Sequence, residues 1–472
     1  MSLDAIVVGS GPNGLAAAIT LARAGRSVRL YEAEPIIGGG MRSAELTEPG
    51  FTHDICSTIH SLALVSPFFK ALPLAGHGLA FLHPTVPLAH PLDDGTAVVV
   101  RRSVDETASA LSSHDARAYR RLFEPFVEHS ADLMDALLGP PGWRHPWLMT
   151  RFGVRAIQSA SGLANRAFDD DRTRAMFAGV AAHSMVPLDM LATAGYGLAL
   201  LIAAHAVGWP VARGGSQALA NALASYFRSL GGEIVTDERV ESLDRLPAAR
   251  AVLCDVTPRQ FLRIAGDRTP SSYARRLRRY RYGPGIFKMD WALSAPVPWH
   301  ARDCRDAGTV HLGGTLGEIA ASERASWSGR SEERPYVLVV QASQCDPSRA
   351  PAGKHTLWAY CHVPHGSTED MRARIEAQIE RYAPGFRECI SARSAMYPAD
   401  LERHNANLVG GDIAGGAADF AQFIARPVLS LNPYKTPVDG VYLCSSSTPP
   451  GIGVHGMCGY YAARSALRAL SS

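Results

Sequence analysis

The order of apolar and polar residues predicts a strand, a helix and a second strand at the start of the chain. The run "DAIVVGSG" is short and apolar, which is typical of a buried parallel strand. "GPNGLAAAITLARAG" follows with helical composition and ends at Gly25, and "SVRLYEAE" has the pattern of another strand. Together they form a βαβ unit of the length that nucleotide-binding domains use.

Similar patterns return later in the chain. Residues 211–230 indicate an amphipathic helix, with Leu219, Leu223 and Phe227 along one face, and "GGEIVTDERVESL" predicts a pair of strands. "AVLCDV" and "GVYLCSSS" each predict a further strand, and a helical pattern begins after the second of them. The fold class is therefore expected to be α/β, with elements of one sheet drawn from distant segments.

The same patterns suggest how the chain divides into domains. Residues 1–65, 210–280 and 405–472 are expected to form one nucleotide-binding domain. Residues 66–209 are rich in helical patterns and are expected to form a cap. Residues 281–404 contain strand patterns and are expected to form the sheet of a substrate domain.

Three glycines at the first strand–helix turn match the pattern G-x-G-x-x-G. Gly9 permits the tight turn, Gly11 lets a diphosphate approach the backbone, and Gly14 lets the helix pack closely on the strand. The helix N-terminus offers free N–H groups to phosphates. Glu32 ends the second strand, where an acid binds a ribose hydroxyl.

A second G-x-G-x-x-G lies near the other end of the chain, at Gly451, Gly453 and Gly456. A Pro-rich loop separates its glycines from the preceding strand, and no further strand or acidic residue follows the helix. These features argue against a second nucleotide site. We expect both glycine clusters to hold one cofactor, with the first cluster at its phosphates and the later cluster and its helix at its other end.

Composition narrows the functional class. The 472 residues carry a net charge of +3, which gives no indication of a nucleic-acid partner. Eight Cys occur without a C-x-x-C pair, and no metal-ligand cluster is evident, so we expect no metal. The start of the chain does not resemble a secretion signal, which indicates a cytoplasmic protein.

One long apolar segment leaves the relation to membranes open. Residues 190–212 contain no Asp, Glu, Lys or Arg. This length approaches that of a membrane span, but the Gly, His and Pro within it favour a buried helix that lines an apolar cavity. A surface that dips into a bilayer is the third interpretation, so a peripheral membrane contact is included in the expected localisation.

Several motifs together resemble one family. "VVGSGPNGLAAAITLARAG", "GGGMRSAEL", "FTHDICSTIHSLALVSPFF", "YGPGIFKMDWALSAPVPW" and "STPPGIGVHGMCGYYAARSAL" are similar to segments of the phytoene desaturase and carotenoid isomerase-like NAD(P)/FAD-dependent oxidoreductases, within the amine-oxidase-like flavoproteins. The resemblance covers essentially the whole chain. It implies FAD as the cofactor, a glutathione-reductase-like FAD-binding Rossmann domain and a discontinuous α+β substrate domain with a helical cap.

The glycine patterns and the resemblance together give a set of expected cofactor-binding residues. These are Gly9, Gly11, Pro12, Asn13, Gly14, Glu32, Ala33, Gly39, Gly40, Met41, Arg42, Ser43, Asp54, Ser57, Val240, Gly453, Val454, His455 and Met457. By resemblance, Arg42 meets the diphosphate and Val240 lies against the adenine.

Three residues are candidates for catalysis. The resemblance implies that the loop containing His60 passes the flavin ring. There His60 would act as a base or orient the substrate, and the alternative is a loop histidine that only bonds the backbone. Lys288 stands in a strand among apolar residues; by resemblance it holds a water at the flavin N5, and a salt bridge with Asp290 is the alternative. His455 stands where the related desaturases carry Pro, and we expect it to contact flavin or substrate.

The sequence therefore predicts an FAD-dependent oxidoreductase that dehydrogenates or isomerises a largely apolar small molecule by hydride transfer to the flavin N5. An amine-oxidase-like enzyme is the alternative in the same class, and a flavin-bound scaffold without activity is the alternative in another. The expected electron acceptor is oxygen or a quinone. The oligomeric state stays open, with a homodimer as one option.

Overall fold

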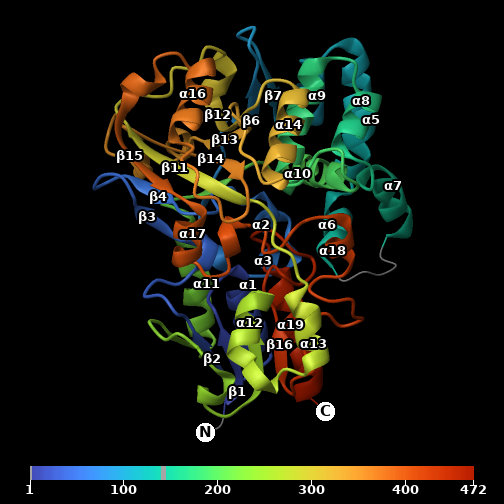
Figure 1. The fold of residues 1–472 in the computed structure, drawn as a ribbon, viewed down its shortest axis with the longest axis vertical. Coiled ribbons are helices and arrows are strands. Elements are labelled where there is room, and N and C mark those ends of the chain that lie inside the picture. The colour runs from blue at the N-terminus through green and yellow to red at the C-terminus, as the bar shows by residue number, and fades with distance from the viewer. Residues whose placement is uncertain (1–2, 140–144, 472) are drawn as a thin grey trace.

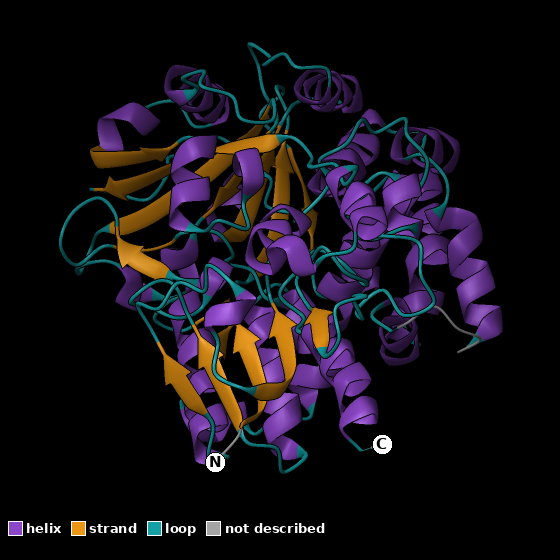
Figure 2. Cartoon of the chain, turned by 60° about the horizontal axis from the view of Figure 1, so that its bottom comes forward, coloured by secondary structure: helices purple, strands orange, loops and turns teal. Residues whose placement is uncertain are grey.

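The computed structural model describes residues 3–139 and 145–471, which form one five-stranded sheet, one seven-stranded sheet and two short two-stranded sheets, with helices around them (Figures 1 and 2). Figure 2 shows the five-stranded sheet near the two termini and the seven-stranded sheet at the opposite end of the molecule. A belt of short elements and loops lies between them.

The first sheet has five strands in the order β16-β10-β1-β2-β9, and all of its pairs are parallel. Its strands are β1 (Leu3–Val8), β2 (Val28–Tyr31), β9 (Glu233–Val235), β10 (Ala249–Cys254) and β16 (Val441–Leu443). Each of the three segments expected for the nucleotide domain contributes a strand. The pair of strands expected within 231–243 is wrong, because only β9 forms there and residues 238–242 have no regular structure.

Both faces of this sheet are covered, as a parallel sheet requires. Successive side chains of a strand point to opposite faces. Ala5 and Val7 accordingly join the core with α1 (Pro12–Arg23), α11 (Ser216–Ser229) and α19 (Met457–Leu470). Ile6 and Val8 instead join the core with α12 (Pro258–Ala265) and α13 (Ser271–Arg278).

The second sheet has seven strands in the order β15-β11-β14-β13-β12-β6-β7. They are β6 (Val86–Pro91), β7 (Ala97–Val100), β11 (Gly285–Leu293), β12 (Ala307–Leu312), β13 (Val337–Val340), β14 (His355–Val363) and β15 (Ile390–Met396). All pairs are antiparallel except β12 with β6. Residues 86–100, which the sequence pattern places in the helical cap, lie in this sheet instead.

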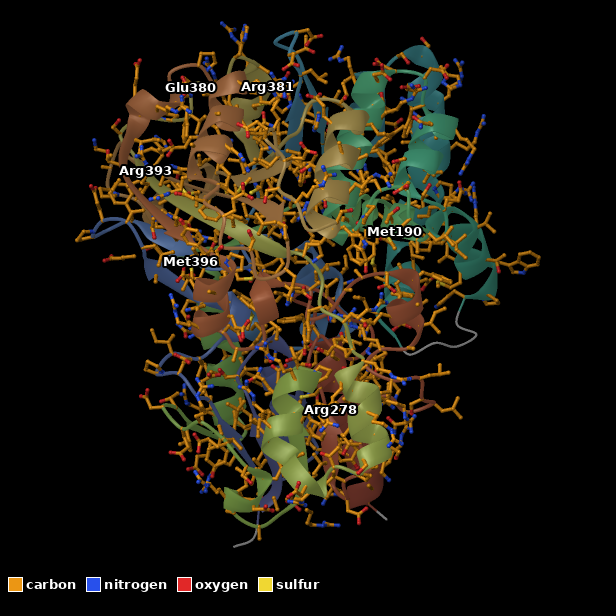
Figure 3. All side chains as sticks on the ribbon, in the orientation of Figure 1. Met190, Arg278, Glu380, Arg381, Arg393 and Met396 are labelled. Carbon is orange, nitrogen blue, oxygen red and sulfur yellow. The ribbon has the colours of Figure 1, made fainter. Side chains whose placement is uncertain are left out.

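Alternation along β13 and β14 also separates the two faces of the second sheet. Leu357, Ala359 and Cys361 pack on the outer layer that contains α16 (Arg372–Tyr382). Figure 3 labels Glu380, Arg381 and Arg393 in this outer region. The β14 side chains that alternate with Leu357, Ala359 and Cys361, such as Trp358 and Tyr360, point to the opposite face, toward the helices and the first sheet.

Helices cover the inner side of the second sheet. They are α4 (Val104–Ser109), α5 (Ser113–Val127), α6 (Ser130–Leu137), α7 (Pro146–Ala156), α8 (Ala160–Ala167), α9 (Asp171–Ala181), α10 (Thr193–Val207) and α14 (Leu316–Trp327). Short elements complete the fold: β3 (Ser43–Glu45), β4 (Thr52–Asp54), α2 (Ser61–Val65), α3 (Pro67–Lys70), β5 (Phe81–Leu82), β8 (Val211–Ala212), α15 (Ala342–Cys345), α17 (Pro398–His404) and α18 (Phe420–Ile424).

The long apolar segment forms α10 and β8. Leu198, Leu201 and Ile202 are fully buried, in agreement with the buried-helix interpretation. Among the described residues, no helix has the length and apolar character that crossing a bilayer requires.

Candidate functional site

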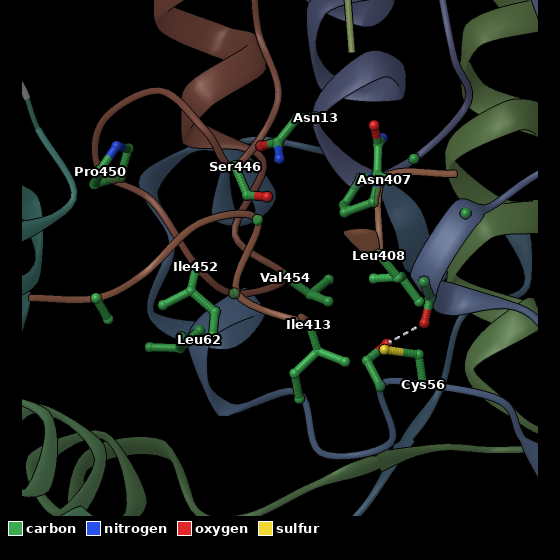
Figure 4. A pocket seen from close by; sticks show the side chains of 18 of the residues that line it. Asn13, Cys56, Leu62, Asn407, Leu408, Ile413, Ser446, Pro450, Ile452 and Val454 are labelled. Carbon is green, nitrogen blue, oxygen red and sulfur yellow. Dashed lines mark hydrogen bonds between the residues drawn. The ribbon is translucent and has the colours of Figure 1, made fainter. Parts of the chain in front are cut away.

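A cavity of about 990 Å³ lies between the two sheets. The ends of β1, β2 and β10 and the loops after them line one part of it, which we call the nucleotide end. Helices α7 and α10 and strands β12, β13 and β14 line the other part, which we call the sheet end. Figure 4 shows a middle portion, where Cys56, Leu62, Ile413 and Ile452 approach from different segments.

The turn from β1 to α1 is shaped by its glycines. Gly9 has a φ of +99°, a left-handed conformation that favours glycine. A Cβ on Gly14 would lie 1.9 Å from the carbonyl oxygen of Gly9, so only glycine allows α1 to approach the strand this closely. The first turn of α1 has no acidic residue, and its N–H groups have no intrahelical carbonyl partners.

Glu32 reinforces this turn from the end of β2. Its Oε2 accepts hydrogen bonds from the backbone N–H of Ser10, at 2.9 Å, and from the Ser10 hydroxyl. Its Oε1 accepts the N–H of Glu34 at 3.0 Å. A carboxylate has about four acceptor positions, so Glu32, which lines the cavity, retains capacity for a ribose hydroxyl.

The second glycine run lies directly against the first. A Cβ on Gly39 would lie 3.0 Å from the Cα of Gly11, so the two loops touch through backbone. Arg42 is buried beside them, and its guanidinium donates to the carbonyl oxygens of Gly39 and His404. Arg42 therefore places a positive charge on the cavity wall, next to the start of α1.

Asp255 adds a carboxyl group at the same place. It follows β10, lines the cavity, and its Oδ2 accepts the N–H of Gly14 at 2.8 Å. Burial, opposed by that hydrogen bond and assisted by the charge of Glu32, raises the pKa of Asp255 to about 7. A carboxyl group with this pKa is about half protonated at pH 7, which reduces its repulsion of an anion at the helix N-terminus.

The C-terminal glycine run reaches the same cavity. Gly453 and Val454 line it together with Pro449, Pro450 and Ile452. Gly456 precedes α19 with a φ of +68°, and a Cβ there would lie 3.0 Å from the Cβ of Ala16 in α1. The two glycine clusters therefore face one cavity, because their helices pack side by side.

These residues fit a dinucleotide. The glycine backbones leave room for a diphosphate beside the start of α1, Arg42 supplies a positive charge and Glu32 supplies acceptors for a ribose. The Oδ1 atom of Asn13, a residue that lines the cavity, is buried without a hydrogen-bond partner in the described protein. An unpaired polar atom at this position is consistent with a site that a ligand completes.

The expected cofactor residues fall into two groups. The cavity is lined by Gly9, Gly11, Pro12, Asn13, Glu32, Ala33, Gly39, Gly40, Arg42, Ser57, Val240, Gly453 and Val454. Gly14, Met41, Ser43, Asp54, His455 and Met457 are not among the lining residues. Of these, Asp54 is held in a buried ion pair with Arg349 at 3.0 Å and accepts the Ser43 hydroxyl at 2.7 Å.

His60 is not on the cavity wall either. Its Nε2 is 2.9 Å from the hydroxyl oxygen of Ser216, and that hydroxyl donates to the carbonyl oxygen of Ser57 at 2.5 Å. The Nε2 atom of His60 must therefore be the donor. Burial lowers the pKa of His60 to about 4, so the ring is neutral. These contacts favour the interpretation of His60 as a residue that fixes the loop at Ser57 rather than as a base.

Lys288 forms the salt bridge that was the alternative expectation. Its Nζ contacts both carboxylate oxygens of Asp290, and both side chains are buried. The same Nζ lies 5.3 Å from the ring centroid of Trp358, which lines the cavity. Lys288 itself is not among the residues that line the cavity, and its contacts are those of a buried ion pair. The role of holding a water at a flavin stays a prediction.

His455 uses both ring nitrogens within the protein. Nδ1 accepts the N–H of Met457 at 3.0 Å, and Nε2 donates to the carbonyl oxygen of Gly451 at 3.2 Å. Burial lowers its pKa to about 4. The ring thus caps the start of α19 and closes the glycine loop, which differs from the expected direct contact with flavin or substrate.

Sequence reasoning missed several lining residues. They include Cys56, Asp255, Asn405, Asn407, Arg426 and Ser446. Asp255 had a signal, because it follows a strand of the parallel sheet, where ligands bind at the carboxyl ends. The others come from loops without regular patterns, and only the fold brings them to the cavity.

Comparisons with known proteins agree with this architecture. Residues 7–72 match the NAD(P)-binding Rossmann-like domain. Over 99% of its length the chain is 28% identical to pyridine nucleotide-disulfide oxidoreductase domain-containing protein 2 of Rattus norvegicus, 94% of which is covered. Over 95% of its length it is 26% identical to phytoene dehydrogenase of Streptomyces griseus, 92% of which is covered.

The fold is also found in a solved amine oxidase. A triple mutant of putrescine oxidase superposes with a TM-score of 0.64 and 18% identity, covering 99% of both chains. At this identity the likeness concerns the fold alone. The chain is thus similar over nearly its full length to phytoene dehydrogenase and shares the fold of a solved amine oxidase. Together with the glycine-lined cavity and the matched Rossmann-like domain, these similarities identify the protein as an oxidoreductase.

Proposed function

We propose that the cavity binds one FAD along its length and that the enzyme dehydrogenates or isomerises a largely apolar, uncharged small molecule. The observation that carries this proposal is that both glycine clusters, from opposite ends of the chain, line a single cavity whose other end is apolar and aromatic. When bound, the flavin supplies the hydride acceptor that such a reaction needs.

The chain's own residues would hold and orient the reactants. Glu32 is positioned for a ribose, the start of α1 and Arg42 for the diphosphate, and Val240 for the adenine. The loop at Gly453 and Val454 is positioned beside the ring. Trp358, Tyr360 and Leu338 form a rigid floor on strands of the second sheet, which would fix the substrate and exclude water from the reacting bond.

The distribution of acidic residues favours a neutral substrate over an amine. Among the described residues, the acids that line the cavity are Glu32, Glu34, Glu238 and Asp255, and all four lie at the nucleotide end. A cationic substrate at the sheet end would be desolvated without a carboxylate partner, which is unfavourable. The amine-oxidase alternative is therefore the weaker candidate for this chain.

The cavity mouth supports access for an apolar molecule. Ile157, Phe423 and Ile424 line the cavity and are also exposed to solvent. Trp147 and Leu431 lie in adjoining segments and are almost fully exposed, at 87% and 108%. These side chains support the expected peripheral contact with a membrane, where apolar substrates and quinone acceptors dissolve. Oxygen is the other proposed acceptor.

Anaerobic absorption spectroscopy tests the proposal. We expect the purified protein to carry one FAD per chain and an apolar substrate to bleach its absorption band near 450 nm, a range characteristic of oxidised flavins in general. Hydrogen peroxide formed on admitting air would identify oxygen as the acceptor, and its absence together with quinone reduction would identify a quinone. A protein that neither retains nor takes up FAD would overturn the proposal.

A further inference from the structure

The sheet end of the cavity contains a histidine that no role described above uses. His183 follows α9, lines the cavity and is half-buried. Its Nε2 lies 3.2 Å from the Nε2 of His311, a fully buried residue of β12. Of two nitrogens at this distance, one must donate and the other accept.

The surroundings of His311 decide which nitrogen donates. Its Nδ1 atom is buried and has no hydrogen-bond partner among the described residues. A proton there would be a buried donor without an acceptor, which is more unfavourable than a bare lone pair. The proton of His311 therefore resides on Nε2, which donates to Nε2 of His183.

It follows that His183 carries its own proton on Nδ1. Both rings are neutral, because burial lowers the pKa of His183 to about 3 and that of His311 well below its usual value. No side chain or carbonyl group of the described protein accepts a hydrogen bond from Nδ1 of His183, and this atom is not enclosed as Nδ1 of His311 is. His183 thus offers one N–H donor to the cavity, in a fixed tautomer.

Tyr360, in β14, offers a second polar group to the same cavity. Its ring lies 20° from parallel with that of Trp358, with centroids 5.7 Å apart, so its orientation is fixed by stacking. Its hydroxyl group has no hydrogen-bond partner among the described residues and is not enclosed. Burial raises the pKa of Tyr360, which keeps the hydroxyl protonated.

We propose that His183 and Tyr360 bind an oxygen atom of the substrate, a hydroxyl or carbonyl group carried by an otherwise apolar molecule. This inference rests on the proposed function and narrows its substrate class. Two neutral donors suit a neutral oxygen acceptor, whereas an ammonium group would face a donor proton and a carboxylate would be desolvated without a cation. A pure hydrocarbon would leave both donors unpaired.

The test measures binding of two probes that differ by one hydroxyl group. Affinities of the purified holoprotein for 2-naphthol and for naphthalene are measured by fluorescence titration. We expect His183→Phe to weaken 2-naphthol binding by about three- to tenfold, the value of one hydrogen bond, and to change naphthalene binding by less than about twofold. Tyr360→Phe is expected to act in the same direction.

Two further variants separate recognition from packing. His183→Gln retains an N–H donor and should recover part of the 2-naphthol affinity. Met149→Leu changes an apolar lining residue and should affect both probes alike. Thermal melting identifies any variant that fails to fold. If His183→Phe fails to fold, the 2-naphthol and naphthalene affinities of Tyr360→Phe and His183→Gln test the proposal instead.

The results that would overturn the inference are equal losses for both probes in the His183 and Tyr360 variants, or no loss for either. Tighter binding of naphthylmethylammonium than of 2-naphthol by the unmodified protein would also overturn it. The absorption spectrum of the same samples reports the flavin separately. A protein without flavin would contradict the proposed function, while the ratio of probe affinities would still test His183.

Discussion

The two ends of the cavity are built by opposite means. At the nucleotide end, glycines form part of the wall. A Cβ on Gly9, Gly11 or Gly39 would lie 3.1, 2.7 or 3.0 Å from another protein atom, so their backbones pack too closely for a side chain. At the sheet end, the wall is made of large side chains such as Trp358 and Tyr360, which alternate on β14. The nucleotide end also carries the charged groups, whereas the sheet end carries neutral rings.

This difference shows which part of the site tolerates change. A wall of backbone fixes the shape of its ligand through turns and helix ends, so one added carbon atom is enough to close it. A wall of side chains can be altered residue by residue without moving a strand. We therefore expect the sheet end to determine which substrate is bound, and the nucleotide end to be common to enzymes with the same cofactor.

The largest expected effect is the difference in flavin affinity between two Gly→Ala variants, one at each end of the cavity. Gly14→Ala would place a Cβ 1.9 Å from a backbone oxygen, and we expect flavin affinity to fall at least about 100-fold. Gly153→Ala, in α7 on the cavity wall, meets no atom within 4 Å and should leave flavin affinity within about twofold. Flavin titration of both variants measures this, and equal effects would break the comparison.

The second effect concerns Lys288, which lies behind the sheet end. Lys288→Met leaves Asp290 buried with only the neutral ring of His53 beside it, at 3.4 Å, and should lower the free energy of unfolding by about 3–5 kcal/mol, measured by urea denaturation. The double variant Lys288→Met, Asp290→Leu should recover most of this loss. If the double variant is stable but its flavin is no longer reduced by substrate, Lys288 has the catalytic role that its contacts do not support.

The third effect is a pH dependence confined to the nucleotide end. The pKa of Asp255 is raised from an ordinary value of 3.8 to about 7 in the folded protein. Between about pH 4 and 7 the folded state therefore holds a proton that the unfolded state has lost. The contribution of Asp255 to the free energy of unfolding decreases as the pH rises through this range. Ionisation also places a negative charge beside the diphosphate. We expect the Kd of FAD to increase about tenfold from pH 5 to pH 8.

Asp255→Asn is the matched variant for this pH dependence. It keeps the size of the side chain and cannot ionise, so its Kd for FAD should be nearly constant over the same pH range. A wild-type Kd that does not change with pH, or an Asn variant that retains the change, would show that Asp255 is not the titrating group.

The smallest effect is expected at His455. Its ring caps α19, so His455→Ala should lower the free energy of unfolding by about 1 kcal/mol, measured by thermal or urea denaturation. The pKa of about 4 keeps the ring neutral above pH 5, so the pH profile of flavin reduction between pH 6 and 9 should not change. A profile that loses an inflection in this variant would restore a catalytic role for His455.

Much of the nucleotide end could be predicted because its physics is local. A strand, a glycine turn and a helix are adjacent in sequence, and so are the lining residues between Gly9 and Arg42. The expected residues that fail to line it, such as Asp54 and Ser43, are bonded to Arg349 and to residues 216–217, whose proximity no local pattern reveals.

The sheet end was less accessible to sequence reasoning. Its lining depends on which strands are neighbours, and β6 and β7 join a sheet whose other strands come some 190 residues later or more. Lys288 and His455 were recognised as unusual by their surroundings in sequence. Lys288 bonds Asp290 on the same strand face, and His455 bonds the backbone around Gly451. These contacts give both residues a structural role, while their catalytic roles stay predictions.

The order of the five-stranded sheet has a consequence for how the protein is made. β1 is synthesised more than 200 residues before its neighbour β10, and β16 and α19 follow later still. In the folded protein α19 packs tightly on α1, since a Cβ on Gly459 would lie 1.8 Å from the carbonyl oxygen of Asn13. Until α19 is synthesised, this face of α1 is uncovered. A chain truncated before Pro449 would therefore lack both the helix that covers this face of α1 and the loop at Gly453 and Val454 that lines the cavity.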